Sequence, residues 1–289
     1  MIDVKDYESA GVTTELNISV WTANKLDRGA TNSVLATNEA RSRDAGHFRK
    51  NLMAGSRQRK DIADFAAQCR LQHNYLTAPW ADTGPRWLFM SLFMEHKEEL
   101  GAKRTIFWTM VDNFIRQYPE TQRVAEYTLG KLFNPSDYPT ADEVRSKFDF
   151  KLVYSPVAPN HWAVAFADEV KAELSQQYEK SFEDRITKVT REPWNRLHKL
   201  LTTMVEKLAD KVGDEKTTKR YHETLITNAQ TLCPMLTHLN LTKDPKLELA
   251  RQQLETIMAG ADIDRIKTDP TVRKDMKENL DAMLKKFEW

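Results

Sequence analysis

The sequence is poor in glycine, in cysteine and in long apolar runs. Nine glycines in 289 residues argue against an all-β fold, because many tight turns require the conformational freedom of glycine. The two cysteines, Cys69 and Cys233, are too few for a disulfide framework, so we expect reduced thiols and a cytoplasmic location. The most apolar stretch, Trp87–Met94, is too short to cross a bilayer, and the first residues, MIDVKDYESAG, lack the apolar core of a signal peptide.

The chain also lacks an excess of charge of either sign. Its 43 Lys and Arg residues balance 42 Asp and Glu residues, so overall charge selects no class of partner. Apolar residues make up 40% of the chain and charged residues 29%, which is typical of amphipathic helices with a large solvated surface. Seven Trp and 12 Phe residues exclude general disorder, because these side chains need an apolar core.

Most apolar residues recur every three or four positions, a spacing that predicts amphipathic helices. The expected fold class is mainly α, with a helical hairpin in the first half and a bundle of long helices in the second. Thr140 and Glu143 have the spacing of a capping box and predict a short helix. The other expected helices cover 38–76 with breaks near Gly46 and Gly55, Arg86–Tyr118, a short stretch from Pro119, Trp162–Val212 as one kinked helix or two helices split at Pro193, about Glu215–Cys233, and the stretches after Asp244-Pro245 and Asp269-Pro270.

Two segments alternate apolar and polar residues, which is the pattern of half-buried strands. They are Glu15–Trp21 and Phe148–Tyr154. A single strand leaves its backbone N–H and C=O groups unpaired, so each segment needs a partner. We expect the two to pair as a small two-stranded antiparallel element, residues 15–21 with 148–154.

A domain boundary is expected at Pro156–Asn160, where a proline-containing segment leaves the second strand. It divides the chain into residues 1–159, an N-terminal α+β domain with a helical hairpin, and residues 160–289, a C-terminal helical bundle. The regular apolar stripe from Phe166 to Val189 has two interpretations. It either belongs to the core of the bundle or forms a coiled-coil seam that binds a partner. Its step of four residues drifts around the helix and favours the core.

The segment Arg41–Lys60 holds seven basic residues and a single acidic one, Asp44. On one continuous helix, Arg43, Lys50 and Arg57 lie near one face, and such a face neutralises phosphates. The alternative is a solvated helix face that pairs with acidic residues elsewhere. The candidate nucleic-acid-binding residues are Arg41, Arg43, Arg49, Lys50, Arg57, Arg59 and Lys60.

The remaining patterns do not support catalysis, a metal or a cofactor. Gly55–Lys60 resembles a phosphate-binding loop but lacks the second glycine and the final Ser or Thr. Cys69 and His73 have the spacing of two metal ligands on a helix, but no second pair follows, so we interpret them as a buried thiol and a partly exposed imidazole. Met94–Glu99 is interpreted as a solvated helix face, and Asp262 and Asp264 are interpreted as helix caps. The remaining histidines are scattered along the chain and suggest no catalytic triad; they are His161, His198, His222 and His238.

Two short motifs carry a resemblance to a known family. NISVWTANKLD ends a strand in Trp-Thr, and VRSKFDFKLVY places an arginine before a strand of spaced aromatic residues. Together with the helical regions around them, they resemble the phage and mobile-element family called domain of unknown function 3150, over most of the chain. That family has glycine after Trp-Thr, where this chain has Ala23. The resemblance implies no catalytic residues; it implies a bacterial host cell and a partner protein, because members are encoded near MoxR-type AAA ATPases and von Willebrand A-type proteins.

These observations lead to two functional hypotheses. The first is a non-enzymatic accessory protein that acts through protein–protein contacts of its C-terminal helices, with the AAA ATPase that the resemblance implies as partner. The second is a DNA- or RNA-binding protein that uses the basic segment. No catalytic constellation supports an enzyme, and the sequence leaves open whether the chain forms a homo-oligomer.

Overall fold

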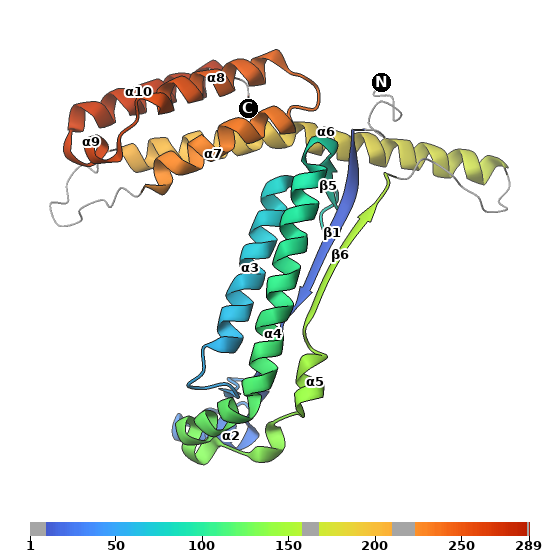
Figure 1. The fold of residues 1–289 in the computed structure, drawn as a ribbon, viewed down its shortest axis with the longest axis vertical. Coiled ribbons are helices and arrows are strands. Elements are labelled where there is room, and N and C mark those ends of the chain that lie inside the picture. Colours follow the sequence, from blue (N-terminus) through green and yellow to red (C-terminus); the bar gives the residue numbers. More distant parts are fainter. Residues whose placement is uncertain (1–9, 158–167, 210–222, 288) are drawn as a thin grey trace. The chain divides into compact units, whose positions relative to one another are not determined.

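The computed structural model describes residues 10–157, 168–209, 223–287 and 289. The protein is mainly α-helical with a small antiparallel sheet (Figure 1), which confirms the predicted fold class. The strands are β1 (Gly11–Ser19), β2 (Asn24–Leu26), β3 (Arg49–Asn51), β4 (Thr77–Pro79), β5 (Arg86–Phe89) and β6 (Asp149–Ser155). The helices are α2 (Arg28–Thr37), α3 (Gln58–Leu76), α4 (Phe93–Leu129), α5 (Ala141–Arg145), α6 (Asp168–Leu208), α7 (Thr224–Leu239), α8 (Pro245–Ala259), α9 (Ile263–Thr268) and α10 (Pro270–Lys286), with 3-10 turns η1 (Met90–Leu92), η2 (Gly130–Leu132) and η3 (Pro135–Asp137).

The chain divides into two compact units, each with its own core. The ribbon unit consists of Thr14–Leu76 and Met94–Tyr154, and the bundle unit consists of residues 10–13, Thr77–Phe93 and the described residues from Ser155 onward. Compactness does not show which segments fold independently. The division into domains 1–159 and 160–289 therefore stays a prediction.

The predicted partnership between the two distant strands is confirmed. In the four-stranded sheet the order is β4-β5-β1-β6, so β1 and β6 are neighbours, and they run in opposite directions (Figure 1). The first strand ends earlier than predicted, at Ser19. Beyond it, the carbonyl oxygen of Trp21 accepts a hydrogen bond of 2.8 Å from Nε of Arg59. A side chain, and not a neighbouring strand, therefore satisfies this backbone group.

The sheet has two more strands than predicted, because Arg86–Phe89 forms β5 and does not begin a helix. Trp87, Leu88 and Phe89 are all buried, and three consecutive buried residues fit a strand that is covered on both faces better than one side of a helix. β5 pairs antiparallel with β4, with Leu88 opposite Thr77 and Arg86 opposite Pro79.

The predicted helix over 38–76 is also wrong in its first half. Asp27 caps α2 by accepting a hydrogen bond of 2.9 Å from the backbone N–H of Ala30, so this helix begins at Arg28, before the predicted start at residue 38. The chain then forms β3, which pairs antiparallel with β2, and helix α3 begins only at Gln58.

Pro119 lies inside a helix, contrary to the prediction, whereas for Pro193 the structure has the first of the two predicted alternatives, one helix. α4 continues through Pro119, and the described part of the long C-terminal helix, α6, continues through Pro193. A proline removes one hydrogen bond from a helix, and in α4 the buried residues on both sides of Pro119, such as Phe114 and Ala125, hold the helix against the core. The capping box of Thr140 and Glu143 is confirmed.

The core of the ribbon unit lies between the pair of helices α3 and α4 and the strands β1 and β6 (Figure 1). Aromatic rings fill it: the ring centroids of Phe107 and Phe150 are 5.5 Å apart, and those of Trp21 and Tyr118 are 6.0 Å apart. Such contacts add to the stabilisation that comes from apolar burial. The arrangement fixes the ends of α3 and α4, where the candidate site residues lie.

The core of the bundle unit lies among α6, α7, α8 and α10. Asp244 and Asp269 cap α8 and α10 as predicted, each accepting a hydrogen bond of 2.8 Å from a backbone N–H. Asp262 caps α9 in the same way. In α6 the stripe residues Phe182, Ile186 and Val189 are buried, whereas Phe166 and part of the next predicted helix, 215–222, lie outside the described residues.

Candidate functional site

The basic segment Arg41–Lys60 is not the continuous helix that the sequence predicts. It forms a loop, the strand β3, a turn and only then the first residues of α3. The turn contains Gly55 at φ +81°, a left-handed conformation that breaks a helix and that glycine adopts without strain. Arg43, Lys50 and Arg57 therefore do not share a helix face, and this part of the prediction is wrong.

The seven basic residues differ in their exposure. Arg59 is half-buried and uses its Nε for the carbonyl oxygen of Trp21, and Lys50 is buried. The other five side chains point to solvent from a loop, from β3 and from the start of α3. They are Arg41, Arg43, Arg49, Arg57 and Lys60.

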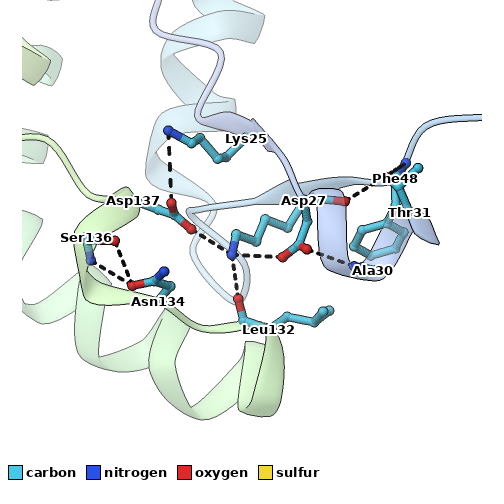
Figure 2. Close-up of polar contacts among 10 residues, drawn as sticks. Lys25, Asp27, Ala30, Thr31, Phe48, Leu132, Asn134, Ser136 and Asp137 are labelled. Atoms are coloured by element: carbon cyan, nitrogen blue, oxygen red, sulfur yellow. Dashed lines mark hydrogen bonds and ion pairs between the residues drawn. The ribbon is translucent and has the colours of Figure 1, made fainter. Parts of the chain in front are cut away.

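Lys50 lies at the centre of a polar cluster between β3, the start of α2 and the turns that follow α4. Figure 2 shows oxygen atoms of Asp27, Leu132 and Asp137 converging on one nitrogen atom. Nζ is 2.7 Å from Oδ2 of Asp137, 3.1 Å from Oδ2 of Asp27 and 2.7 Å from the carbonyl oxygen of Leu132. Three acceptors saturate the three donors of an ammonium group, so the lysine is fully hydrogen-bonded inside the protein.

The charges in this cluster stabilise one another. Burial by itself lowers the pKa of Lys50, but hydrogen bonds to Asp137 and Asp27 outweigh burial and hold this pKa above its ordinary value. The backbone N–H of Ala30 and the ammonium of Lys50 in turn lower the pKa of Asp27. The lysine is therefore charged and is neither a nucleophile nor a base. It fastens β3 to the end of α4.

A second polar cluster lies within the ribbon unit, and sequence reasoning missed it. Nε2 of His96 is 3.0 Å from Nδ1 of His73, and Nδ1 of His96 is 3.0 Å from the hydroxyl oxygen of Tyr154. Both histidines are buried, and His96 is 0% exposed. The expectations of a partly exposed His73 and of His96 on a solvated face are wrong.

The histidine cluster is suited to holding elements together. Burial lowers the pKa of His96 to about 4, so the ring is neutral at pH 7, with one nitrogen donating and the other accepting. The three groups therefore form a one-directional chain of hydrogen bonds across α3, α4 and β6. Burial raises the pKa of the nearby Cys69 thiol, which keeps it from acting as a nucleophile.

The spacing of residues contained a signal for this cluster. His73 continues the buried stripe of α3 at steps of three and four residues, after Ile62, Ala66 and Cys69. His96 precedes the buried Leu100 by one turn. A histidine in register with an apolar stripe indicates a buried ring.

Other candidate ligands do not gather. The part of the chain that the structure describes contains no group of three or more His, Cys, Asp or Glu residues arranged to hold a metal ion. His198 packs against Trp289 with tilted rings whose centroids are 4.9 Å apart, and His238 is exposed. His161 and His222 lie outside the described residues.

A groove lies on the surface of the bundle unit between α8 and α10. Its volume is about 570 Å³. Leu249, 44% exposed, lies at its edge, and Ile257, Ala282 and Met283 provide the other apolar surface. Lys286 is the one charged residue in a lining that also holds Gln252, Gln253, Thr256 and Asn279.

Comparisons with known proteins do not add to this description. No protein-family profile, curated protein or solved structure matches the chain. Among the helices that the structure describes, none carries an apolar stretch of membrane-spanning length. The function is therefore argued from the surfaces described above.

Proposed function

We propose that this protein is a non-enzymatic accessory protein that acts through protein–protein contacts, and that the groove between α8 and α10 is its contact surface. The observation that carries the proposal is the exposure of Leu249 in a groove whose lining holds a single charged residue, Lys286. Exposed apolar surface framed by polar residues is characteristic of interaction sites.

The shape of the groove suits an amphipathic helix as the bound segment. Leu249, Gln253 and Ile257 follow one another at four-residue steps along α8, and Asn279, Met283 and Lys286 do so at three to four residues along α10. A helix that lays its apolar face between two helices makes contacts at this repeat. The amide side chains of the lining offer hydrogen bonds to the polar edge of such a helix.

The partner proposed is a MoxR-type AAA ATPase, working with a von Willebrand A-type protein. This rests on the resemblance of NISVWTANKLD and VRSKFDFKLVY to the family encoded beside such ATPases. The buried, unpaired Cys69 and Cys233 support a reducing compartment, so we place the protein in the cytoplasm of a bacterial host cell.

Photo-crosslinking tests the groove. A photoreactive amino acid replaces Ala282 in the full chain, and crosslinked proteins from host cells are identified by mass spectrometry. We expect an ATPase to be captured, and the addition of Leu249→Asp to reduce its capture at least about tenfold, because a buried charge at an interface costs more than 1.4 kcal/mol. Leu71→Asp is the control, because Leu71 is 69% exposed but belongs to α3.

Three results would count against the proposal. They are capture of no protein, equal capture by the Leu249→Asp and unsubstituted chains, and loss of capture in the Leu71→Asp control. Capture of a second copy of the chain would identify a homo-oligomer and would remove the ATPase from the proposal.

Binding to DNA or RNA is the second candidate function. It is favoured by the five basic side chains that remain exposed within Arg41–Lys60, where Asp44 is the one acidic residue. Replacing Arg41, Arg43, Arg49 and Arg57 with Ala should weaken salt-sensitive binding to oligonucleotides. Lys50 and Arg59 should be left intact in this test, because both hold the fold together. Unchanged binding in the fourfold variant, or no binding at low salt, removes this function.

A further inference from the structure

We propose that the ribbon unit carries a surface for single-stranded nucleic acid at the end of α4, in which the exposed ring of Tyr127 stacks on a base and Arg123, Lys131, Arg57 and Arg49 neutralise the backbone phosphates. We call these five residues the tyrosine surface. The proposal rests on the second candidate function, nucleic-acid binding, and adds to it the class of nucleic acid and a residue from another part of the chain.

Tyr127 is the first observation. Its side chain is 92% exposed on α4, which is unusual for a large ring that most proteins at least partly bury. Arg123 lies one turn before it on the same helix, and Lys131 follows in η2, just beyond the end of α4. Both are exposed. Residues four positions apart are neighbours on a helix surface, so Arg123 lies beside the ring.

The packing of the turn between β3 and α3 is the second observation. Gly55 lies so close to α4 that a Cβ atom at this position would be 2.7 Å from Oγ1 of Thr128 and 2.8 Å from Cγ1 of Val124. Thr128 follows Tyr127 directly, and Val124 precedes it by one turn. The turn that holds Gly55 and Arg57 is therefore fixed beside the part of α4 that carries the tyrosine.

The Lys50 cluster brings a further cation to the same end of the unit. The bond of 2.7 Å from Nζ of Lys50 to the carbonyl oxygen of Leu132 fastens β3 next to Lys131. Arg49, the residue before Lys50, is exposed on this strand. The buried lysine thus positions an exposed arginine without contacting a ligand itself.

The acidic groups at this end are mostly occupied. Glu120 pairs with Arg123 at 3.0 Å, and Asp137 pairs with Lys50 at 2.7 Å and with Lys25 at 4.0 Å. Glu126 is exposed beside Tyr127, as is Glu120 two turns before it. The four basic residues of the tyrosine surface thus outnumber the two exposed acidic residues of this part of α4.

An aromatic ring among cations matches the chemistry of single strands. Cations contact phosphates, and an exposed ring stacks on any base that is not already paired and stacked in a duplex. A duplex offers phosphates but keeps its bases inside. An acidic protein would use the same cations, and comparison of Tyr127 variants distinguishes the two, because charge alone does not require the ring.

The test measures binding of the full chain to a fluorescent 20-nucleotide dT strand, and to a duplex of equal length, over a range of salt concentrations. Tyr127→Ala should weaken binding to the single strand at least about fivefold, which corresponds to about 1 kcal/mol of base stacking, without changing the salt dependence. Tyr127→Phe should restore binding, because the ring suffices for stacking. Arg57→Ala with Lys131→Ala should lower the slope of log K against log salt by about 1.4, or about 0.7 for each phosphate contact to a single strand.

Leu71→Ala is the control for a change of exposed apolar surface in the same unit and should bind as the unsubstituted chain does. The thermal midpoint should be unchanged in Tyr127→Ala, since the side chain is exposed. Binding that is unaffected by Tyr127→Ala, or stronger binding to the duplex, overturns the tyrosine surface and leaves the second candidate function in place. No binding to either probe at low salt overturns both.

Discussion

At the scale of single residues, Lys50 shows that a basic residue in a basic segment can serve the fold. Its ammonium group is held by two carboxylates and a carbonyl oxygen, with 4% of its side chain exposed. A buried charge is stable only while its partners remain. Lys60, ten positions further along the chain, points to solvent.

Replacing Lys50 with Met should lower the free energy of unfolding by about 2–3 kcal/mol, because the carboxylates of Asp27 and Asp137 lose the cation between them. Urea unfolding measures the change. Lys60→Met is the control and should change stability by less than about 0.5 kcal/mol. Equal effects of the two substitutions would show that the Lys50 cluster contributes nothing to stability.

His96 makes the protein sensitive to acid. Its pKa is about 4 in the folded protein, against 6.5 for an ordinary histidine. Between these values the unfolded chain binds a proton that the folded chain does not, so stability falls as the pH decreases from about 6.5 to about 4. Above 6.5 both states are neutral and the effect is absent. One proton over this range changes the free energy of unfolding by about 3 kcal/mol.

The variant His96→Gln should therefore have a flatter dependence of stability on pH. Urea unfolding at several values between pH 4.5 and pH 7.5 measures it. Tyr154→Phe is the matched variant: it removes one hydrogen bond and about 1 kcal/mol, but it keeps the imidazole and so the pH dependence. A pH dependence of His96→Gln as steep as that of the unsubstituted chain would assign the acid sensitivity to other groups.

At the scale of elements, the contact between the β3–α3 turn and α4 depends on a glycine. Gly55→Ala places a methyl group against Thr128 and Val124 and also forces an alanine to φ +81°. Gly84→Ala imposes the same strain at φ +86° with nothing within 4 Å of the new methyl group. The first substitution should cost about 2 kcal/mol or more and the second about 1 kcal/mol, as measured by thermal unfolding. Equal costs would show that the turn moves freely away from α4.

Element types could be predicted from the sequence where one pattern dominated. The β1–β6 pair, the capping box at Thr140 and the proline-started helices α8 and α10 were predictable because alternation and caps act locally. The strand β5 was not, since burial on every side, which distinguishes it from one face of an amphipathic helix, cannot be read from a short apolar run in the sequence. The continuation of α4 through Pro119 depends on tertiary packing that no local pattern contains.

At the scale of the whole molecule, the two hydrophobic cores draw their residues from different units. We expect unfolding in urea to show two transitions. Phe114→Ala, in the core of the ribbon unit, and Leu254→Ala, in the core of the bundle unit, should each destabilise by about 3 kcal/mol or more. Each should shift a different transition. One transition that both substitutions shift equally would show a single cooperative unit.

The candidate sites were less predictable than the fold because they depend on tertiary contacts. The composition of Arg41–Lys60 identifies basic residues, five of which are exposed, but the sequence does not show that Lys50 meets Asp137 or that Gly55 meets Thr128. Both contacts join residues far apart in the chain. Arg49 and Arg57 therefore come to the same end of the ribbon unit as Tyr127 only in three dimensions.

The distance in sequence between β1 and β6 has a consequence for synthesis. Thr13 and Ser155 contact each other across 142 positions. Because the ribosome adds about 5–20 residues per second, the N-terminal strand leaves the exit tunnel on the order of ten seconds before its neighbour does. During that interval one edge of β1 is an open template for pairing with another nascent chain. We therefore expect the cell that makes this protein either to shield this edge with a chaperone or to complete the ribbon unit slowly after the chain is released.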